Sequence, residues 1–217
     1  MFVSWASIYE GSSDATYFGT LIPRVINDIL LARARRPVDV ASFPSLEFGA
    51  RGKSLEEIAR EICEGQEAFH LLFSHADTGG RSQEVSAVDR AMAYARAASD
   101  LCGFETEKCF PILPRKEMES WALADSGAVS TALGYKGNPS DLGLPTSAQA
   151  AERLPDPKLT LHQAISSVKK RVRPRDSARL LASVAQIQSL SVLRGCRSFG
   201  EFEASLIGRL DSEGFLR

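Results

Sequence analysis

The chain has 217 residues, of which 44% are hydrophobic and 24% charged, and its formal net charge is −1. This length and composition predict a compact protein with one sizeable hydrophobic core and room for a small additional subdomain. The near-neutral net charge gives no argument for nucleic acid or a membrane surface as a partner. A charged partner has to be inferred from local clusters of charged residues.

The cysteines and the N-terminus bear on the cellular compartment. Cys63, Cys102, Cys109 and Cys196 are widely spaced, and none belongs to a Cys-x-x-Cys pair. We therefore expect reduced thiols rather than a zinc site or a disulfide framework. The first residues lack the basic start and long apolar core of a signal peptide, and no apolar run is long enough to span a bilayer. The expected location is the cytoplasm.

In the first 113 residues, short runs rich in aromatic and β-branched residues alternate with stretches whose apolar residues recur at helical spacing. In chain order the predictions are strand 2–9, a helix that ends at 33, strand 38–43, a helix that ends near 64, strand 69–73, helix 83–101 and strand 108–113. Ser12, Ser13 and Asp14 supply capping side chains for the first helix, and Ser54 to Glu57 form a capping box for the second. Pro111 in the last strand favours an edge position. Strands separated by helices of crossover length predict parallel β-α-β units with right-handed connections.

A phosphate-binding loop has to be considered between the second strand and the second helix. Gly52-Lys53-Ser54 follows a predicted loop, 44–53, and precedes a helix, which is the context of the Gly-x-x-x-x-Gly-Lys-Ser motif. Glu47 stands where the motif requires its first glycine, and its carboxylate would repel the phosphates. The sequence thus disfavours a nucleotide-binding loop, while Lys53 stays available to contact a phosphate.

Beyond Tyr135 the character of the chain changes. A loop rich in Gly, Pro, Asn and Asp is followed only by helical patterns. These helices are predicted over 147–153, 159–172, 176–190 and 199–210. We predict an α/β domain over 1–135 and a helical C-terminal extension over 136–217 that packs on it.

Residues of the types that can bind metals follow three of the predicted strands. Glu10 follows the first strand, His75 and Asp77 follow the third, and Glu119 comes after the fourth. Because the carboxyl ends of parallel strands meet at one edge of a sheet, where ligands bind, we expect these side chains to converge. The alternative is that Asp77 caps a helix or turn and that His75 is an ordinary loop residue.

These motifs together resemble an uncharacterised bacterial family with a TOPRIM-like fold. The resemblance lies in Glu10-Gly11, in the acidic motif after the third strand, in Leu113-Pro114 leading into Glu119-Ser-Trp121-Ala-Leu-Ala-Asp125, and in Leu193 to Phe199. It implies a mostly parallel four-stranded sheet flanked by helices, with a C-terminal helical subdomain. TOPRIM domains occur in topoisomerases, primases and the nucleases of the OLD family and related defence systems. The implied function is a metal-dependent nuclease in phage defence or DNA repair, beside an ATPase partner.

The resemblance also implies roles for the acidic residues. Glu10 would be a metal ligand or general base, Asp77 a metal ligand, and Glu119 a further acidic member of a site for Mg²⁺ or Mn²⁺. His75 stands where the family has the first Asp of Asp-x-Asp, so as a softer, neutral metal ligand it should favour Mn²⁺ or Zn²⁺ over Mg²⁺. This replacement leaves an alternative open, in which the protein is a non-catalytic binding or effector subunit with a degenerate metal site.

A basic stretch from Lys169 to Arg175 is the densest local concentration of positive charge, and its candidate nucleic-acid contacts are Lys169, Lys170, Arg171 and Arg173. With Lys53, these residues are the predicted docking surface for phosphates. The alternative is that the run only ends a solvated helix, where the helix dipole favours cations.

Overall fold

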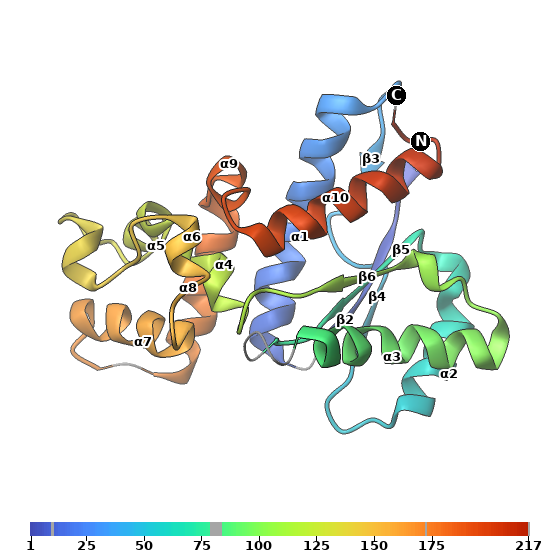
Figure 1. Ribbon diagram of the computed structural model, residues 1–217, viewed down its shortest axis with the longest axis horizontal. Helices are drawn as coiled ribbons and strands as arrows, with labels where there is room; N and C mark the ends of the chain where they lie inside the picture. Colours follow the sequence, from blue (N-terminus) through green and yellow to red (C-terminus); the bar gives the residue numbers. More distant parts are fainter. Residues whose placement is uncertain (10, 79–83, 172, 217) are drawn as a thin grey trace.

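The structure is a computed structural model that describes residues 1–9, 11–78, 84–171 and 173–216. Its centre is a four-stranded parallel sheet with strand order β4-β2-β5-β6 (Figure 1). The strands are β2 (Trp5–Tyr9), β4 (Leu46–Gly49), β5 (Leu71–His75) and β6 (Cys109–Ile112). Two further short strands, β1 (Phe2–Val3) and β3 (Asp39–Val40), pair only with each other. The predicted mixed α/β class with a parallel four-stranded sheet is thus confirmed.

Helices cover both faces of this sheet and continue beyond it. Their bounds are α1 (Ser12–Arg33), α2 (Leu55–Gly65), α3 (Glu84–Cys102), α4 (Glu119–Leu123), α5 (Ser126–Ala132), α6 (Ala148–Ala151), α7 (Pro157–Val168), α8 (Pro174–Ile187), α9 (Leu190–Leu193) and α10 (Arg197–Ser212). Helices α1 and α10 lie on one face, and α2 and α3 lie on the other (Figure 1). Among the described residues, no helix is both long and apolar enough to cross a membrane.

The alternation of side chains along β5 explains the two layers. Leu71 and Phe73 join the core beneath α1 and α10, whereas Leu72 joins a smaller core beneath α2 and α3. Successive side chains of a strand point to opposite faces, and this strand is apolar on both because helices cover both. His75 ends the strand on the α1 face, two residues after Phe73.

The edge of the sheet next to β2 differs from the prediction. Only Asp39–Val40 of the expected strand 38–43 is extended, and it pairs with β1 outside the main sheet. The edge strand is β4, which lies in the segment 44–53 that we expected to be a loop. Its Phe48 is buried while Glu47 and Gly49 are exposed, the period-two pattern of a half-buried edge strand. Prolines and glycines around β4 obscured that pattern.

The cysteine expectation was wrong for two of the four residues. Cys63 at the end of α2 and Cys102 at the end of α3 form a disulfide, and Cys109 and Cys196 are buried thiols. The pairing joins residues 39 positions apart, so it follows from the packing of α2 against α3 and not from a local motif. Such bonds are typical of oxidising compartments, and the expected cytoplasmic location stays a prediction.

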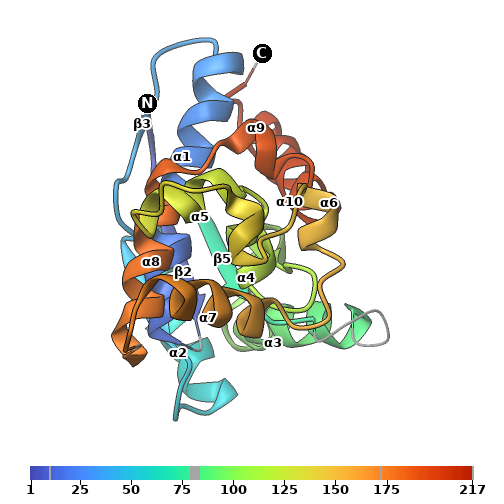
Figure 2. The same cartoon turned by 90° about the vertical axis from the view of Figure 1, so that its left-hand side faces the viewer.

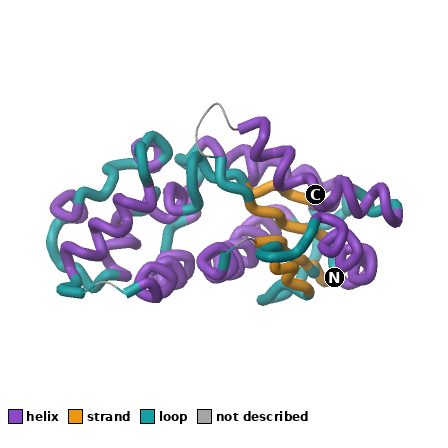
Figure 3. Tube along the Cα trace, turned by 90° about the horizontal axis from the view of Figure 1, so that it is seen from below, coloured by secondary structure: helices purple, strands orange, loops and turns teal. Residues whose placement is uncertain are grey.

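The helices after β6 extend to one side of the sheet and then return to it. Figure 1 shows α4 to α8 beyond the end of the sheet, with α10 running back over it. Figure 3 shows a group of helices to one side of the strands, and Figure 2 shows this helical side from the front. Helix α8 packs along α1, where the Tyr17 hydroxyl donates to Gln188 Oε1 at 3.0 Å. The larger core holds side chains from both sides of residue 135. The division at that residue remains a prediction.

Buried Glu152 ties α6 to the start of α10. Its carboxylate accepts the backbone N–H groups of Arg197 at 2.8 Å and Ser198 at 2.9 Å, as well as the Ser198 hydroxyl. These amides are among the first four of a helix, which have no partner within the helix itself. A carboxylate at this end also suits the helix dipole.

We expect Glu152→Ala to lower the free energy of unfolding by about 2 kcal/mol, because it leaves the partly buried donors at the start of α10 without their acceptor. Glu201→Ala is the matched control, since Glu201 belongs to α10 but forms only an exposed ion pair with Arg197. Urea unfolding of both variants measures the difference. Equal losses in the two variants would contradict the capping role of Glu152.

Candidate functional site

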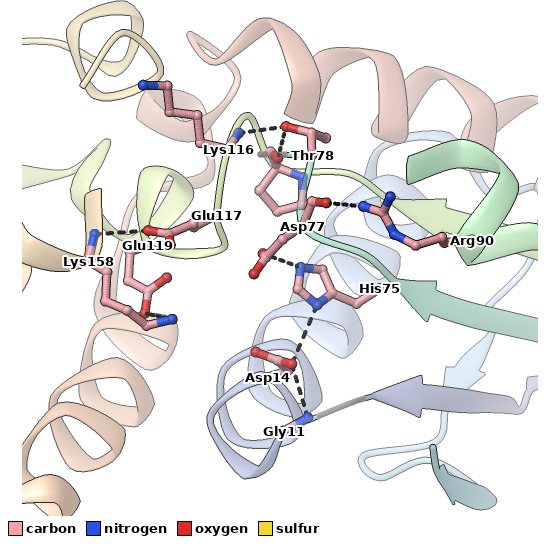
Figure 4. A network of polar contacts seen from close by, with 11 residues as sticks. Gly11, Asp14, His75, Asp77, Thr78, Arg90, Lys116, Glu117, Glu119 and Lys158 are labelled. Carbon is pink, nitrogen blue, oxygen red and sulfur yellow. Dashed lines mark hydrogen bonds and ion pairs between the residues drawn. The ribbon is translucent and has the colours of Figure 1, made fainter. Parts of the chain in front are cut away.

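A polar site lies at the carboxyl ends of β5 and β6, beside the first turn of α1. His75 is the last residue of β5, Asp77 follows it, and Glu119 begins α4 after β6. Figure 4 shows these side chains together with Asp14 of α1 and Lys158 of α7. Parallel strands bring their carboxyl ends to one edge, which accounts for His75, Asp77 and Glu119. Helices α1 and α7 bring Asp14 and Lys158, more than 140 positions apart, to the same place (Figure 4).

His75 lies between two aspartates. Its Nδ1 is 3.5 Å from Asp14 Oδ2, and its Nε2 is 3.3 Å from Asp77 Oδ1. The ring is buried and lies 4.9 Å from the ring of Phe18, centroid to centroid. Burial by itself lowers the pKa of His75, but the two carboxylates outweigh burial and raise that pKa to about 9. At neutral pH the residue is therefore an imidazolium that joins α1 to the loop after β5.

Contacts to both the side chain and the backbone hold Asp77 in place. Its carbonyl accepts a hydrogen bond of 2.6 Å from the Arg90 guanidinium of α3. Burial of the carboxylate raises its pKa, but His75, Lys158 and the backbone N–H of Met118 act in the opposite direction, and the net shift is downward. Asp77 is therefore ionised at neutral pH, with half of its side chain exposed toward the site.

The loop between β6 and α4 is held in an uncommon conformation beside Asp77. Lys116 has a φ of 67°, in the left-handed region that side chains other than glycine rarely adopt. Its N–H donates to Thr78 Oγ1 at 2.7 Å, and its Nζ donates to the Pro155 carbonyl at 2.7 Å. Lys116 thus connects the loop after β5 with the segment before α7, and these bonds hold the strained backbone in place.

Glu119 is a buried carboxylate with one cation nearby. The Lys158 Nζ lies 4.0 Å from Glu119 Oε1, beyond direct hydrogen-bond distance. Burial raises the pKa of Glu119, Lys158 opposes this, and Glu117 and Asp77 add to the rise. Asp77 and Glu119 therefore lie close enough to repel one another, in a site that has more carboxylates than cations.

The structure brings three of the predicted site residues together, and a fourth lies outside the described residues. His75, Asp77 and Glu119 belong to one polar site, as expected from their positions after the strands. Glu10 lies outside the described residues, so its convergence with Asp77 and Glu119 stays a prediction. The sequence reasoning missed Lys158 as a member of the site. It treated Asp14 only as a helix-capping residue, and Asp14 does accept the Gly11 N–H at 3.2 Å.

The predicted phosphate contacts lie outside this site, and two of them have intramolecular partners. Lys53 Nζ is 2.6 Å from Glu61 Oε1, and Lys169 Nζ is 3.0 Å from Asp176 Oδ1. Lys170, Arg171 and Arg173 are exposed in the connection between α7 and α8. Lys158 and Lys169 lie at opposite ends of α7, so the basic stretch begins roughly 16 Å from the site along the helix.

Across the described ranges of the chain, no group of three or more His, Cys, Asp or Glu side chains has the arrangement of a metal site. The carboxylates of Asp77 and Glu119 still suit a hydrated Mg²⁺ or Mn²⁺, which keeps several waters and takes one or two carboxylates. The third predicted ligand, Glu10, follows directly after β2, the neighbour of β5. His75 is engaged with Asp14 and Asp77 as a cation in this structure.

No protein-family model matches the chain, and neither a curated protein nor a solved structure matches it.

The imidazolium of His75 should make stability depend on pH. A folded pKa of about 9, above the ordinary 6.5, means that stability from its ion pairs is complete below pH 6.5 and is lost as pH rises through about 9. We expect His75→Gln to flatten the decrease in unfolding free energy across this window, measured by urea unfolding at several pH values. The control His162→Gln changes an exposed residue and should retain the wild-type profile. An unchanged profile in His75→Gln would contradict the ion pairs.

Proposed function

We propose that this protein is a metal-dependent phosphodiesterase of TOPRIM type that acts on nucleic acid. The observation that carries the proposal is the location of Asp77 and Glu119, two carboxylates that follow the ends of the neighbouring parallel strands β5 and β6 and lie in one polar site (Figure 4). Perturbed titratable groups that gather at the carboxyl edge of such a sheet are the usual sign of a functional site. The resemblance of the sequence motifs to TOPRIM domains supports the same reading.

Asp77 and Glu119, with Glu10 if it reaches the site, would hold the divalent cation. When bound, this cation would orient a water molecule and neutralise the charge that develops on the phosphodiester. The chain supplies the fixed geometry around it. Asp77 is oriented by the Met118 amide and by His75, and its carbonyl is held by Arg90.

Glu119 is the residue of this site best suited to transfer a proton. Burial and neighbouring carboxylates raise its pKa, so that its proton affinity is greater than that of an exposed glutamate. A carboxyl group in this state can accept a proton from the attacking water or donate one to the leaving oxygen. His75 stays charged and buried, where it balances Asp14 and Asp77.

A nucleic-acid substrate would extend along α7, from the site at Lys158 to the exposed basic residues at the other end of that helix. Lys170 and Arg171 are the strongest candidates for phosphate contacts, because Lys169 is already paired with Asp176. A role in phage defence or DNA repair beside an ATPase partner is part of the proposal, and it is supported by the resemblance alone.

The position of His75 favours a second candidate function. Its imidazolium already neutralises the space between Asp14 and Asp77, where the TOPRIM pattern would have another metal-binding carboxylate. The protein would then be a non-catalytic binding or effector subunit with a degenerate metal site. Binding of Mn²⁺ without any cleavage of DNA or RNA by the purified wild type would favour this candidate over the nuclease.

The nuclease proposal predicts cleavage of DNA or RNA that requires Mn²⁺ or Mg²⁺ and stops when a chelator is added. Asp77→Asn and Glu119→Gln should each lower the cleavage rate by at least about a hundredfold, because they remove a charged ligand or the proton-transfer group. The control Asp89→Asn changes an exposed carboxylate of α3 that pairs with Arg96, and it should cleave at the wild-type rate. Cleavage that continues in the chelator would refute the metal-dependent mechanism.

Removal of the exposed basic residues should weaken nucleic-acid binding and reduce its salt dependence. We expect Lys170→Ala/Arg171→Ala to lower the slope of log affinity against log salt by on the order of one unit per lost contact, measured with short DNA and RNA duplexes. The control Arg35→Ala/Lys136→Ala removes the same charge from exposed positions elsewhere. Identical slopes in the wild type and Lys170→Ala/Arg171→Ala would show that this stretch only ends a solvated helix.

A further inference from the structure

Lys158 occupies a position that helix stability does not explain. It is the second residue of α7, where the dipole of the twelve-residue helix disfavours a positive charge. Its backbone N–H is satisfied by Glu117 Oε2 at 3.2 Å, so the side chain is not needed for capping. The side chain is 65% exposed and reaches back toward the site (Figure 4).

Four carboxylates act electrostatically on the end of this side chain. Glu119 has the strongest electrostatic influence on Lys158, followed by Glu117, Asp77 and Asp14. In the part of the chain that the structure describes, the Lys158 ammonium makes no hydrogen bond, and the carboxylate oxygen with which it pairs, Glu119 Oε1, lies at 4.0 Å. The ammonium therefore balances the charge of the site without a fixed contact, and its flexible stem lets it leave toward solvent.

His75 provides a contrast within the same site. Its ring is buried, packs against Phe18 and contacts a carboxylate on each side. Displacing it would leave the largely buried carboxylate of Asp14 without its cation, which is costly. Of these two cations of the site, Lys158 is the one that an incoming cation can replace.

We propose that Lys158 is a displaceable counter-ion that occupies the cation position beside Glu119 and must move away when a divalent metal ion binds. This inference rests on the proposed function, because it concerns the same carboxylates. It adds a regulatory property, because the Lys158 ammonium competes with the metal ion for the position beside Glu119. The site is then filled only above a certain metal concentration. The competition depends on the charge and position of one side chain.

Binding of Mn²⁺ alone, measured by titration calorimetry on the full chain without nucleic acid, tests this inference. Lys158→Met removes the charge and keeps much of the apolar stem, so it should bind Mn²⁺ about fivefold or more tightly than the wild type. That factor corresponds to one unit charge about 4 Å away in a water-like dielectric. Lys158→Arg keeps the charge and should bind Mn²⁺ with nearly the wild-type affinity.

Lys136→Met is the control for a general change in net charge, since Lys136 is exposed and lies outside the site. It should bind Mn²⁺ as the wild type does. Equal or weaker binding by Lys158→Met, with a wild type that binds Mn²⁺, would overturn the inference and leave the proposed function intact. Equal tightening in Lys158→Met and Lys158→Arg would also overturn it, because the effect would not depend on charge. No binding by any variant would overturn both proposals.

Discussion

The burial of α1 between the sheet and α8 is the constraint on which the rest of the structure depends. Its apolar residues face the strands on one side, where Phe18 contacts Tyr9 and His75. On the other side, Tyr17 and Arg24 hydrogen-bond to the C-terminal end of α8. One helix thereby fixes the C-terminal helices relative to the strand ends. The site requires this, because its residues come from both parts.

Where local signals agree with the tertiary structure, the sequence was sufficient. The apolar spacing from Tyr17 to Leu30 predicted α1 and its end at Arg33, although Pro23 lies within the helix. Ser54 and Glu57 form the expected reciprocal cap of α2, and Pro111 lies in the edge strand β6. The alternation of strands and helices was enough to predict a parallel sheet. It was also enough to place His75, Asp77 and Glu119 at the same sheet edge.

The features that the sequence did not reveal depend on contacts between distant residues. β4 is a strand because β2 offers it a free edge and α2 covers Phe48, whereas its local composition resembles a loop. The disulfide requires α2 and α3 to lie side by side. Asp14 has an adequate local explanation as a cap, which concealed its contact with His75 from β5. Lys158 enters the site only because Glu117 receives the start of α7.

The charges of the site divide it into two halves with different properties. The half between Asp14 and Asp77 is closed, because the buried imidazolium of His75 lies between the two carboxylates and packs against Phe18. The half around Glu119 is open, because the cation that pairs with it among the described residues is an exposed lysine that makes no hydrogen bond to it. A buried carboxylate in such surroundings gains from any additional positive charge. The chemistry of this protein should therefore be sought on the Glu119 side of Asp77, where the charge balance of the described residues is incomplete.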